Sequence, residues 1–381
     1  MSSSRHRTWA TVDLKALKKN LGQVRSRCAE SRIVPIIKAN AYGHGMEQVA
    51  RALKAANTKL AAFAVATLDE ALQLHQLELD TPIVLLGGFA NEEELLECLE
   101  RQIQPVVHSM HQLQALQKRF DEDFFAGNRK IWIKLNTGMN RLGFSSGACF
   151  EAFPAIHRYP DTELVLMSHL AWADDPDNKQ AKDFSYKQMA EFNAVRQRLM
   201  QITDSAVDCS LAASAGILNL PETHYQYVRP GIMLYGGSPM AATTGEELGL
   251  EPVMTLKARI VAINDVKAGG AIGYSARHVC KHNSRVGVVG IGYADGYPRA
   301  ATDGTPVLVH SNGQVLRTGI IGRVSMDMIT IDLTGMDQVQ VGDEVTLWGV
   351  GLSADEVARY AGTISYELFC NLKPRVHMDY I

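Results

Sequence analysis

IVPIIKANAYGHGMEQVARALKAA, residues 33–56, decides the fold of this chain because a strand, a loop and a helix follow one another in it. An apolar run ends at Lys38, a small polar and glycine-rich loop follows, and apolar residues then recur at helical spacing. A strand followed by a covering helix is the unit from which parallel sheets are built. The stretch therefore predicts the first βα unit of an α/β domain.

Seven more apolar segments follow, and helical spacing separates each one from the next. They are LAAFAVA from Leu60, TPIVLLGG from Thr81, IQPVVHS from Ile103, KIWIKLN from Lys130, ELVLMSH from Glu163, VDCSLAA from Val207 and YVRPGIMLYG from Tyr227. Eight strands that alternate with helices predict an α/β fold with a closed (β/α)8 TIM-type barrel. An open doubly wound sheet is the alternative, although no GxGxxG follows the first strand to support its dinucleotide-binding form.

The character of the sequence changes after about residue 240. AATTGEELGLEP, residues 241–252, is typical of a linker, and the runs beyond it are β-branched and broken by Gly, Asp and Asn. Such runs are typical of antiparallel strands, and one helix with a good cap begins at Ser353. We expect two domains. The first is a barrel in residues 1–240, although its first few residues could pair with the C-terminal domain instead. The second is a C-terminal, mainly antiparallel β domain in residues 241–381.

Composition excludes several classes of protein. The 381 residues carry a net charge of −3 and no long basic run, which argues against a nucleic-acid partner. No apolar stretch reaches the roughly 20 residues that a membrane helix needs, and the N-terminus is polar. The six cysteines are scattered without a CxxC pair. We therefore expect a cytoplasmic protein with reduced thiols, no metal site and no membrane contact.

Lys38 has the clearest chemical signature. It ends an apolar strand at the mouth of the predicted core, where desolvation disfavours the ammonium form and lowers the pKa of the amine. Such an amine is a candidate nucleophile toward a carbonyl, including that of pyridoxal phosphate (PLP). On spacing alone, a lysine that extends from a strand end to solvent is the simpler interpretation.

Polar residues at other strand ends favour the functional interpretation. Active sites of such barrels form at the C-terminal ends of the strands, so groups at these ends should converge on one mouth. Besides Lys38, the residues at or just after strand ends are Lys134, Arg141, His169, Ser214 and Arg229. Any one of them could be structural, but their agreement across five strand ends predicts a single site.

The ordered motifs KANAYGHG, GMNRLGF, VRPGIMLYG, IGYADG and GRVSMD resemble those of the alanine racemase family, which is PLP-dependent and of fold type III. The resemblance covers nearly the whole chain, from TWATVDLKALKKNL to GTISYELFCNL. It implies a cytoplasmic isomerase that interconverts L-alanine and D-alanine, either to supply D-alanine for the peptidoglycan of the cell wall or for alanine catabolism.

The resemblance implies a two-base mechanism. Lys38 would form the Schiff base with PLP and serve one face of the substrate, and Tyr274 in AIGYSARH would serve the other. Tyr274 would come from the partner subunit, which makes the active unit a homodimer. Without the resemblance, Tyr274 would be interpreted as an ordinary half-buried strand tyrosine.

The resemblance also implies how PLP is held. Its phosphate would be bound by Tyr42, Ser214, Gly231, Ile232 and Tyr366. Hydroxyls and backbone N–H groups suit a phosphate, and a glycine allows close approach of the backbone. Arg229 would meet the pyridine nitrogen and, because a guanidinium stays protonated, would leave the ring neutral. His169 would link Arg229 to the partner's Tyr274.

Two further sets of residues would handle the substrate. Its carboxylate would meet Arg141 and the backbone N–H of Met326 from the partner subunit. Lys134 matches a lysine that is carbamylated in many members, and a carbamate beside Arg141 would replace a repulsion by an ion pair. Asn136 stands where many members carry aspartate.

An aromatic gate is the last feature that the resemblance implies. Tyr293 and Tyr366 would admit small substrates, and Arg299 and Asp327 would surround the path that leads to them.

Two other functions stay open on the sequence. A PLP-dependent amino-acid decarboxylase of the same architecture would need room for a long basic substrate and no tyrosine opposite the lysine. A non-catalytic PLP-binding homeostasis protein would resemble the barrel alone, whereas about 140 residues follow the barrel here. GYSARH and SMDM favour the racemase.

Overall fold

Eight short parallel strands form the first domain of the computed structural model, which describes residues 6–56, 60–122 and 129–381. In order around the sheet they are β2 (Arg32–Ile33), β9 (Tyr227–Arg229), β8 (Asp208–Ala213), β7 (Thr162–Met167), β6 (Arg129–Lys134), β5 (Ile103–Val107), β4 (Ile83–Leu85) and β3 (Phe63–Val65). Parallel bridges from Ile33 to Leu60 and from Ile36 to Ala64 join the two ends and close the barrel. The predicted eight strands and TIM-type barrel are confirmed.

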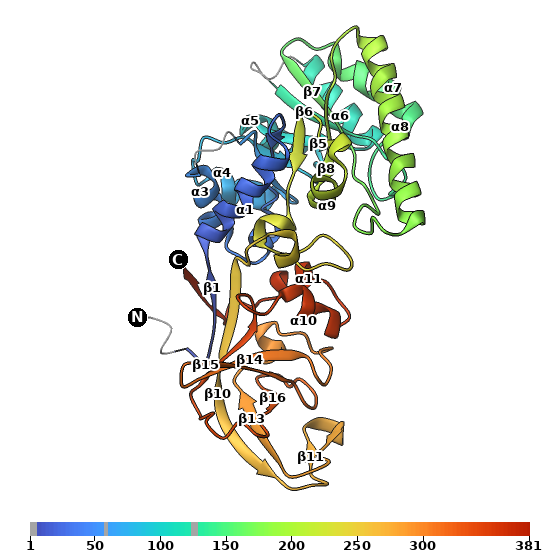
Figure 1. The fold of residues 1–381 in the computed structure, drawn as a ribbon. Helices are drawn as coiled ribbons and strands as arrows, with labels where there is room; N and C mark the ends of the chain where they lie inside the picture. Colours follow the sequence, from blue (N-terminus) through green and yellow to red (C-terminus); the bar gives the residue numbers. More distant parts are fainter. Residues whose placement is uncertain (1–5, 57–59, 123–128) are drawn as a thin grey trace.

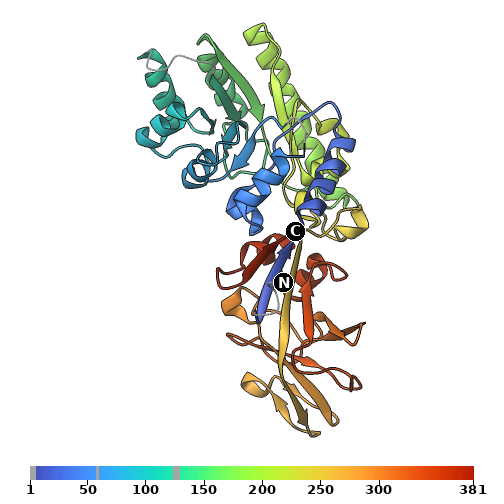
Figure 2. The same cartoon turned by 90° about the vertical axis from the view of Figure 1, so that its left-hand side faces the viewer.

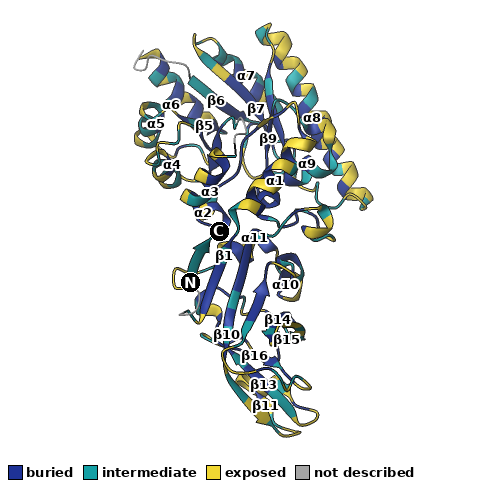
Figure 3. Cartoon of the chain, turned by 60° about the vertical axis from the view of Figure 1, so that its left-hand side comes forward, coloured by how far each residue is buried: buried dark blue, intermediate teal, exposed yellow. Residues whose placement is uncertain are grey.

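Helices cover the outside of the barrel (Figure 1). They are α1 (Leu14–Arg27), α3 (Met46–Lys54), α4 (Leu68–His75), α5 (Glu92–Glu100), α6 (Met110–Asp121), α7 (Ser146–His157), α8 (Lys179–Thr203) and the short α9 (Ser214–Asn219). Several begin at a side chain that accepts a hydrogen bond from the first turn, as Ser109 does for α6 and Asn178 for α8. Figure 3 shows the barrel strands buried and the outer faces of the helices exposed, which is the pattern that their sequence spacing predicts.

The second domain is built on a mainly antiparallel sheet in the order β15 (Gln314–Gly319), β14 (Pro306–Ser311), β17 (Glu344–Trp348), β10 (Met254–Val266), β1 (Thr8–Val12) and β18 (His377–Tyr380). β13 (Ser284–Val289) pairs with β10 and with β16 (Ile329–Asp332). α11 (Ser365–Cys370) packs against residues 38–42 of the barrel, and α10 (Ala354–Tyr360) packs against α11 and β17. The predicted cap of α10 is confirmed, because the Ser353 side chain accepts a hydrogen bond from Asp355 N.

The first strand of the chain belongs to this second sheet. β1 pairs antiparallel with β10 and parallel with β18, so it is the exception to the antiparallel pattern. Figure 2 shows β1 and β10 running side by side down the domain. The barrel is therefore connected to the β domain by two neighbouring strands.

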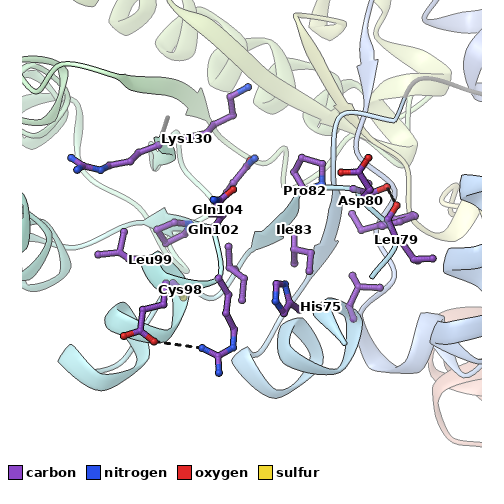
Figure 4. A pocket seen from close by; sticks show the side chains of 18 of the residues that line it. His75, Leu79, Asp80, Pro82, Ile83, Cys98, Leu99, Gln102, Gln104 and Lys130 are labelled. Carbon is purple, nitrogen blue, oxygen red and sulfur yellow. Dashed lines mark hydrogen bonds and ion pairs between the residues drawn. The ribbon is translucent and has the colours of Figure 1, made fainter. Parts of the chain in front are cut away.

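A groove of about 950 Å³ lies at the N-terminal ends of the barrel strands. His75, Ile83, Gln102, Gln104 and Lys130 are among its lining residues (Figure 4). The residues predicted to carry the chemistry follow the opposite, C-terminal ends of the strands, so this groove is separate from the predicted site. No helix in the described part of the chain is long and apolar enough to cross a membrane.

Candidate active site

Lys38 opens a left-handed turn instead of simply ending a strand. The segment labelled α2 (Lys38–Tyr42) has φ between 52° and 55° at four consecutive non-glycine residues, Ala39 to Tyr42. This conformation costs L-residues roughly 1–2 kcal/mol each, so other contacts must hold it. The turn presents Lys38 and Tyr42 on one short, tightly coiled segment at the mouth of the barrel.

Two side chains that are not among the predicted site residues hold this turn. Glu70 accepts a hydrogen bond from Ala39 N at 2.6 Å, and its other carboxylate oxygen accepts one from Ala66 N at 2.8 Å. The buried His44 places Nδ1 2.8 Å from the carbonyl oxygen of Tyr42, and burial lowers its pKa to about 4, which keeps its ring neutral. The T-x-x-E capping pattern, Thr67 to Glu70, is the sequence signal that could have found Glu70.

The structure brings the predicted cationic residues together. Burial, and then the charge of Arg141, lower the pKa of Lys38, and the charge of Glu70 partly offsets them. Burial, and then the charges of Arg229, Arg141 and Lys38, lower the pKa of Lys134 to about 8. A cluster of positive charge of this kind fits an anionic ligand that carries a phosphate or a carboxylate.

His169 lies in the same cluster. Burial, followed by the charges of Arg229 and Lys134, lowers its pKa to about 3, so the imidazole is neutral at physiological pH. A neutral imidazole has one N–H donor and one acceptor nitrogen. His169 can therefore link a cation on one side to a hydroxyl on the other.

Hydrogen bonds to residues on or next to the barrel strands hold the side chain of Arg229 in place. Its terminal nitrogens donate hydrogen bonds to Ser210 Oγ at 2.5 Å, to the carbonyl oxygen of Ser168 at 2.6 Å and to that of Leu211 at 3.1 Å. Only 3% of the residue is exposed, and burial lowers its pKa to about 10, which leaves it charged at neutral pH. All three bonds use the two terminal nitrogens of the guanidinium, so none of them occupies the Nε–H donor.

A cradle for a phosphate lies beside this arginine. Ser214 Oγ accepts a hydrogen bond from Gly231 N at 2.9 Å, and a Cβ at Gly231 would lie 2.7 Å from the hydroxyl of Tyr42. The rings of Tyr42 and Tyr366 are 5.8 Å apart, and burial raises the pKa of both phenols, so both remain donors. A side chain at position 231 would therefore push the hydroxyl of Tyr42 away, and Ile232 begins the next turn (Ile232–Tyr235). These groups fit PLP: hydroxyls and N–H donors for its phosphate, Arg229 for its ring and Lys38 for its carbonyl.

The loop that carries Arg141 is organised by Asn136. Its side-chain oxygen accepts hydrogen bonds from Gly138 N and Asn140 N, both at 3.0 Å. An aspartate could accept the same two bonds, so the asparagine preserves the shape of the loop without a negative charge. Among the described residues, no group of three or more His, Cys, Asp or Glu side chains could hold a metal ion.

The other predicted site residues lie on the second domain and face solvent. Tyr274 is 71% exposed and Met326 is 53% exposed, and Tyr293 and Arg299 are also exposed. Tyr274 follows β11 (Ala271–Ile272), which lies at the end of the β domain farthest from the barrel (Figure 1). The structure of one chain therefore does not bring Tyr274 to Lys38.

A buried carboxylate that is not among the predicted residues anchors the region of the predicted gate. Asp295 is 1% exposed and forms ion pairs with Arg7 at 3.1 Å and with Arg375 Nε at 2.6 Å. Arg375 also pairs with Asp327 at 2.5 Å. Each pair joins distant parts of the chain, so no local sequence pattern reveals it.

This network fixes the gate relative to the loop of Met326. Tyr293 N donates to the carbonyl oxygen of Ser325 at 3.1 Å, and Ala294 N donates to that of Met326 at 2.9 Å. The segments of Tyr293 and Met326 are therefore held as one unit. Tyr366 belongs to the same second domain, but its ring lies beside that of Tyr42 at the barrel mouth, so one of the two predicted gate tyrosines is already at the mouth in a single chain.

Comparisons with known proteins agree with this geometry. The model of the alanine racemase N-terminal domain matches residues 12–239, and that of the alanine racemase C-terminal domain matches residues 253–380. The chain belongs to the alanine racemase family. Members of this family depend on PLP.

Named relatives extend over the whole chain. Alanine racemase of Nitrosomonas eutropha is 44% identical over 368 residues, 96% of this chain and 97% of that protein. The crystal structure of the biosynthetic alanine racemase of Pseudomonas aeruginosa has a TM-score of 0.89 and 37% identity, with 99% of both chains covered. Alanine racemase of Bartonella henselae, solved with covalently bound pyridoxal phosphate, has a TM-score of 0.86 and 29% identity, with 99% of this chain and 100% of that chain covered.

Proposed function

We propose that this PLP-dependent isomerase interconverts L-alanine and D-alanine with two bases, Lys38 and Tyr274, that come from different subunits of a homodimer. The observation that carries the proposal is the division of the site. The cofactor-binding groups meet at the barrel mouth of each chain, whereas Tyr274 is 71% exposed at the far end of the other domain. A second copy of the chain is the direct way to bring them together.

The two bases would act on opposite faces of the substrate. When bound, PLP withdraws electrons from the amino acid and makes its Cα proton acidic. Lys38, whose pKa is lowered by burial, would remove or return this proton on one face. The partner's Tyr274 would do so on the other face, and the neutral His169 would connect its hydroxyl to the charged Arg229.

Binding would depend on the cationic cluster and on the cradle. Tyr42, Ser214, Gly231, Ile232 and Tyr366 would hold the phosphate, and Arg229 would donate to the ring nitrogen. Arg141, with the backbone N–H of the partner's Met326, would hold the carboxylate of alanine. Tyr293 and Tyr366, with Arg299 and Asp327 around them, would form the gate that excludes larger amino acids.

Lys134 would be carbamylated. A pKa of about 8 leaves roughly a tenth of the amine neutral at pH 7. The neutral amine is the form that reacts with CO₂, and the resulting carbamate is an anion that would pair with Arg141. The modification would replace a cation that Arg229, Arg141 and Lys38 all repel.

We also propose that the enzyme works in the cytoplasm, because all six cysteines are free thiols. With a net charge of −3 and no long basic run in the sequence, we expect no nucleic-acid partner, and the partners would be alanine and a second copy of the chain.

Racemisation of a panel of amino acids, with and without added PLP, tests the reaction. We expect conversion of alanine above all others, with D-amino acid oxidase as the readout. Borohydride reduction and peptide mapping test the site, and the reduced cofactor should be found on Lys38. Reduced cofactor on another lysine would overturn the assignment, and release of CO₂ without racemisation would indicate a decarboxylase.

A further inference from the structure

The hairpin that carries Tyr274 has little support of its own. β11 and β12 (His278–Val279) form only two residue pairs, and they stand apart from the eight-stranded sheet. Ser275 and Ala276, at the tip, have φ of 62° and 47°, a conformation that non-glycine residues rarely adopt. Because an isolated two-stranded hairpin is marginally stable, contacts from elsewhere must hold this tip in place.

Asp303 supplies such a contact. It lies on the turn before β14, and its Oδ2 is 2.9 Å from Nδ1 of His278, the first residue of β12. Its Oδ1 accepts a hydrogen bond from Gly322 N at 3.0 Å. Gly322 opens the GRVSMD segment that leads to Met326, so one carboxylate joins the hairpin of Tyr274 to the segment of Met326.

The packing around this carboxylate is consistent with a clamp. Ile272, at the base of the hairpin, packs in a small apolar cluster with Cys280, Val286 and Ile321. A Cβ at Gly322 would lie 3.1 Å from the carbonyl oxygen of Ile272, so the two segments touch. The apolar cluster holds the base of the hairpin. The contact between Asp303 and His278 lies nearer the tip and would fix how the tip is oriented.

We propose that Asp303 and His278 are positioning residues that hold the Tyr274 hydroxyl in register with Met326 and so set the rate of proton transfer on the tyrosine face of the substrate. The proposal rests on the proposed function, in which Tyr274 is the second base. A carboxylate is an acceptor, so Nδ1 of His278 carries the proton in this contact and donates it whether or not the ring is charged.

The exposure of the pair separates positioning from stability. The side chain of His278 is 29% exposed and that of Asp303 is 36% exposed. A contact so accessible to solvent adds little to the stability of the whole fold. Its loss should therefore leave a folded dimer in which the Tyr274 tip is less well placed.

A matched pair of variants of the PLP-loaded enzyme tests the proposal. His278→Asn keeps an N–H donor close to the position of Nδ1, whereas His278→Leu has a similar size and no donor. We expect kcat to fall by about 10- to 100-fold in His278→Leu, because a small misplacement of a reacting group has an effect of this size, while KM for alanine changes little. His278→Asn should recover most of the activity.

Asp303→Ala should reproduce His278→Leu, and the double variant should be no worse than either single one, because both remove the same contact. Thermal unfolding serves as the control for folding. Equal activity of His278→Asn and His278→Leu, or additive losses in the double variant, would overturn the proposal.

Exchange of the Cα proton with deuterated solvent shows which face is affected. In His278→Leu, exchange should slow for the enantiomer whose proton Tyr274 removes, and it should not slow for the other. In a Tyr274→Phe background, the same change should have no further effect. Equal slowing on both faces, or a further loss in that background, would rule out an action through Tyr274.

Hydrogen exchange of the backbone distinguishes the two ways to fail. Amides of residues 270–280 should exchange faster in Asp303→Ala, and those of residues 33–45 should not. Normal proton exchange on both faces in Tyr274→Phe would overturn the second base, and this proposal with it, even if residues 270–280 loosen as expected. Impaired Tyr274→Phe together with unchanged amide exchange in Asp303→Ala would overturn the clamp alone.

Discussion

The barrel mouth and the end of the β domain that carries Tyr274 differ in how far contacts within one chain hold their functional side chains. At the mouth, Arg229 is 3% exposed and its terminal nitrogens make three hydrogen bonds. On the β domain, Tyr274 is 71% exposed on a hairpin of two residue pairs. The cofactor half is thus preorganised, whereas the half that would supply the second base is presented outward. In the proposed homodimer, such a division would let a small substrate enter between two subunits while the cofactor half stays assembled.

The largest effect should follow from a change at the mouth. Lys38→Ala removes both the attachment point of PLP and one base, so racemisation should fall by about 10⁴-fold in both directions. Lys182→Ala, on the outer helix α8, serves as a control and should keep normal activity. A coupled D-alanine assay measures the loss. Substantial residual activity in Lys38→Ala would place the base elsewhere and weaken the contrast between the two regions.

The next effect concerns the exposed face. Tyr274→Phe removes one oxygen and nearly preserves the shape, so the rate should fall by about 10³-fold, within the range for a positioned acid–base group. Tyr186→Phe alters another exposed tyrosine and should be silent. Exchange of the Cα proton with solvent should become unequal for the two enantiomers. If Tyr274→Phe racemises alanine normally in both directions, Tyr274 is not a catalytic base.

A smaller effect tests whether the two regions meet across subunits. Mixing Lys38→Ala and Tyr274→Phe subunits should restore about a quarter of wild-type activity, since half of the dimers are mixed and each mixed dimer has one intact site. Subunit exchange is checked with a tag on one variant. Exchanged subunits that stay as inactive as their parents would mean that each chain uses its own tyrosine.

The smallest effect concerns stability at the mouth. The pKa of Lys134 is about 8 in the folded chain, below its usual 10.5, so the unfolded chain binds more protons between these pH values. The free energy of unfolding therefore rises with pH through this window, and the cost of the buried cation is fully present below pH 8.

Lys134→Met removes that cation. In buffer without CO₂ at pH 7, it should raise the free energy of unfolding by about 1–2 kcal/mol, after allowance for solvent screening of a partly exposed amine, and the gain should vanish above about pH 10.5. Urea denaturation measures this, and bicarbonate should stabilise the wild type alone. A less stable Lys134→Met at pH 7 would contradict the predicted repulsion.

The sequence predicts the barrel well because each strand is a continuous apolar run buried on both faces, as IVPII and KIWI illustrate. It does not predict the left-handed turn after Lys38, because alanine has no preference for positive φ and contacts with Glu70 and His44 impose the conformation. Nor does it predict the ion pairs of Asp295, since Arg7 is 288 residues away in the chain. Arg375, in the C-terminal KPRV segment, completes this network.

The roles within the site could be predicted only in part from chemistry. Strand-end positions predict that Lys38, Lys134, His169 and Arg229 converge, and the structure brings them together. The part assigned to Tyr274 depends on the family resemblance, because an exposed hairpin tyrosine has no distinguishing sequence pattern. Asp303 and His278 are missed for the same reason: their contact forms only after distant turns fold together.

The pairing of β1 with β10 has a consequence for how the chain is made. β1 precedes the barrel in the chain, yet its two neighbours in the sheet, β10 and β18, follow the whole barrel. During translation the barrel sequence emerges before either neighbour exists, so it can close while β1 waits unpaired. β18 (His377–Tyr380), which follows the other strands of the domain in the sequence, then covers the free edge of β1. The β domain is therefore completed only after β18 has been made, and with it the surface that would meet the second subunit.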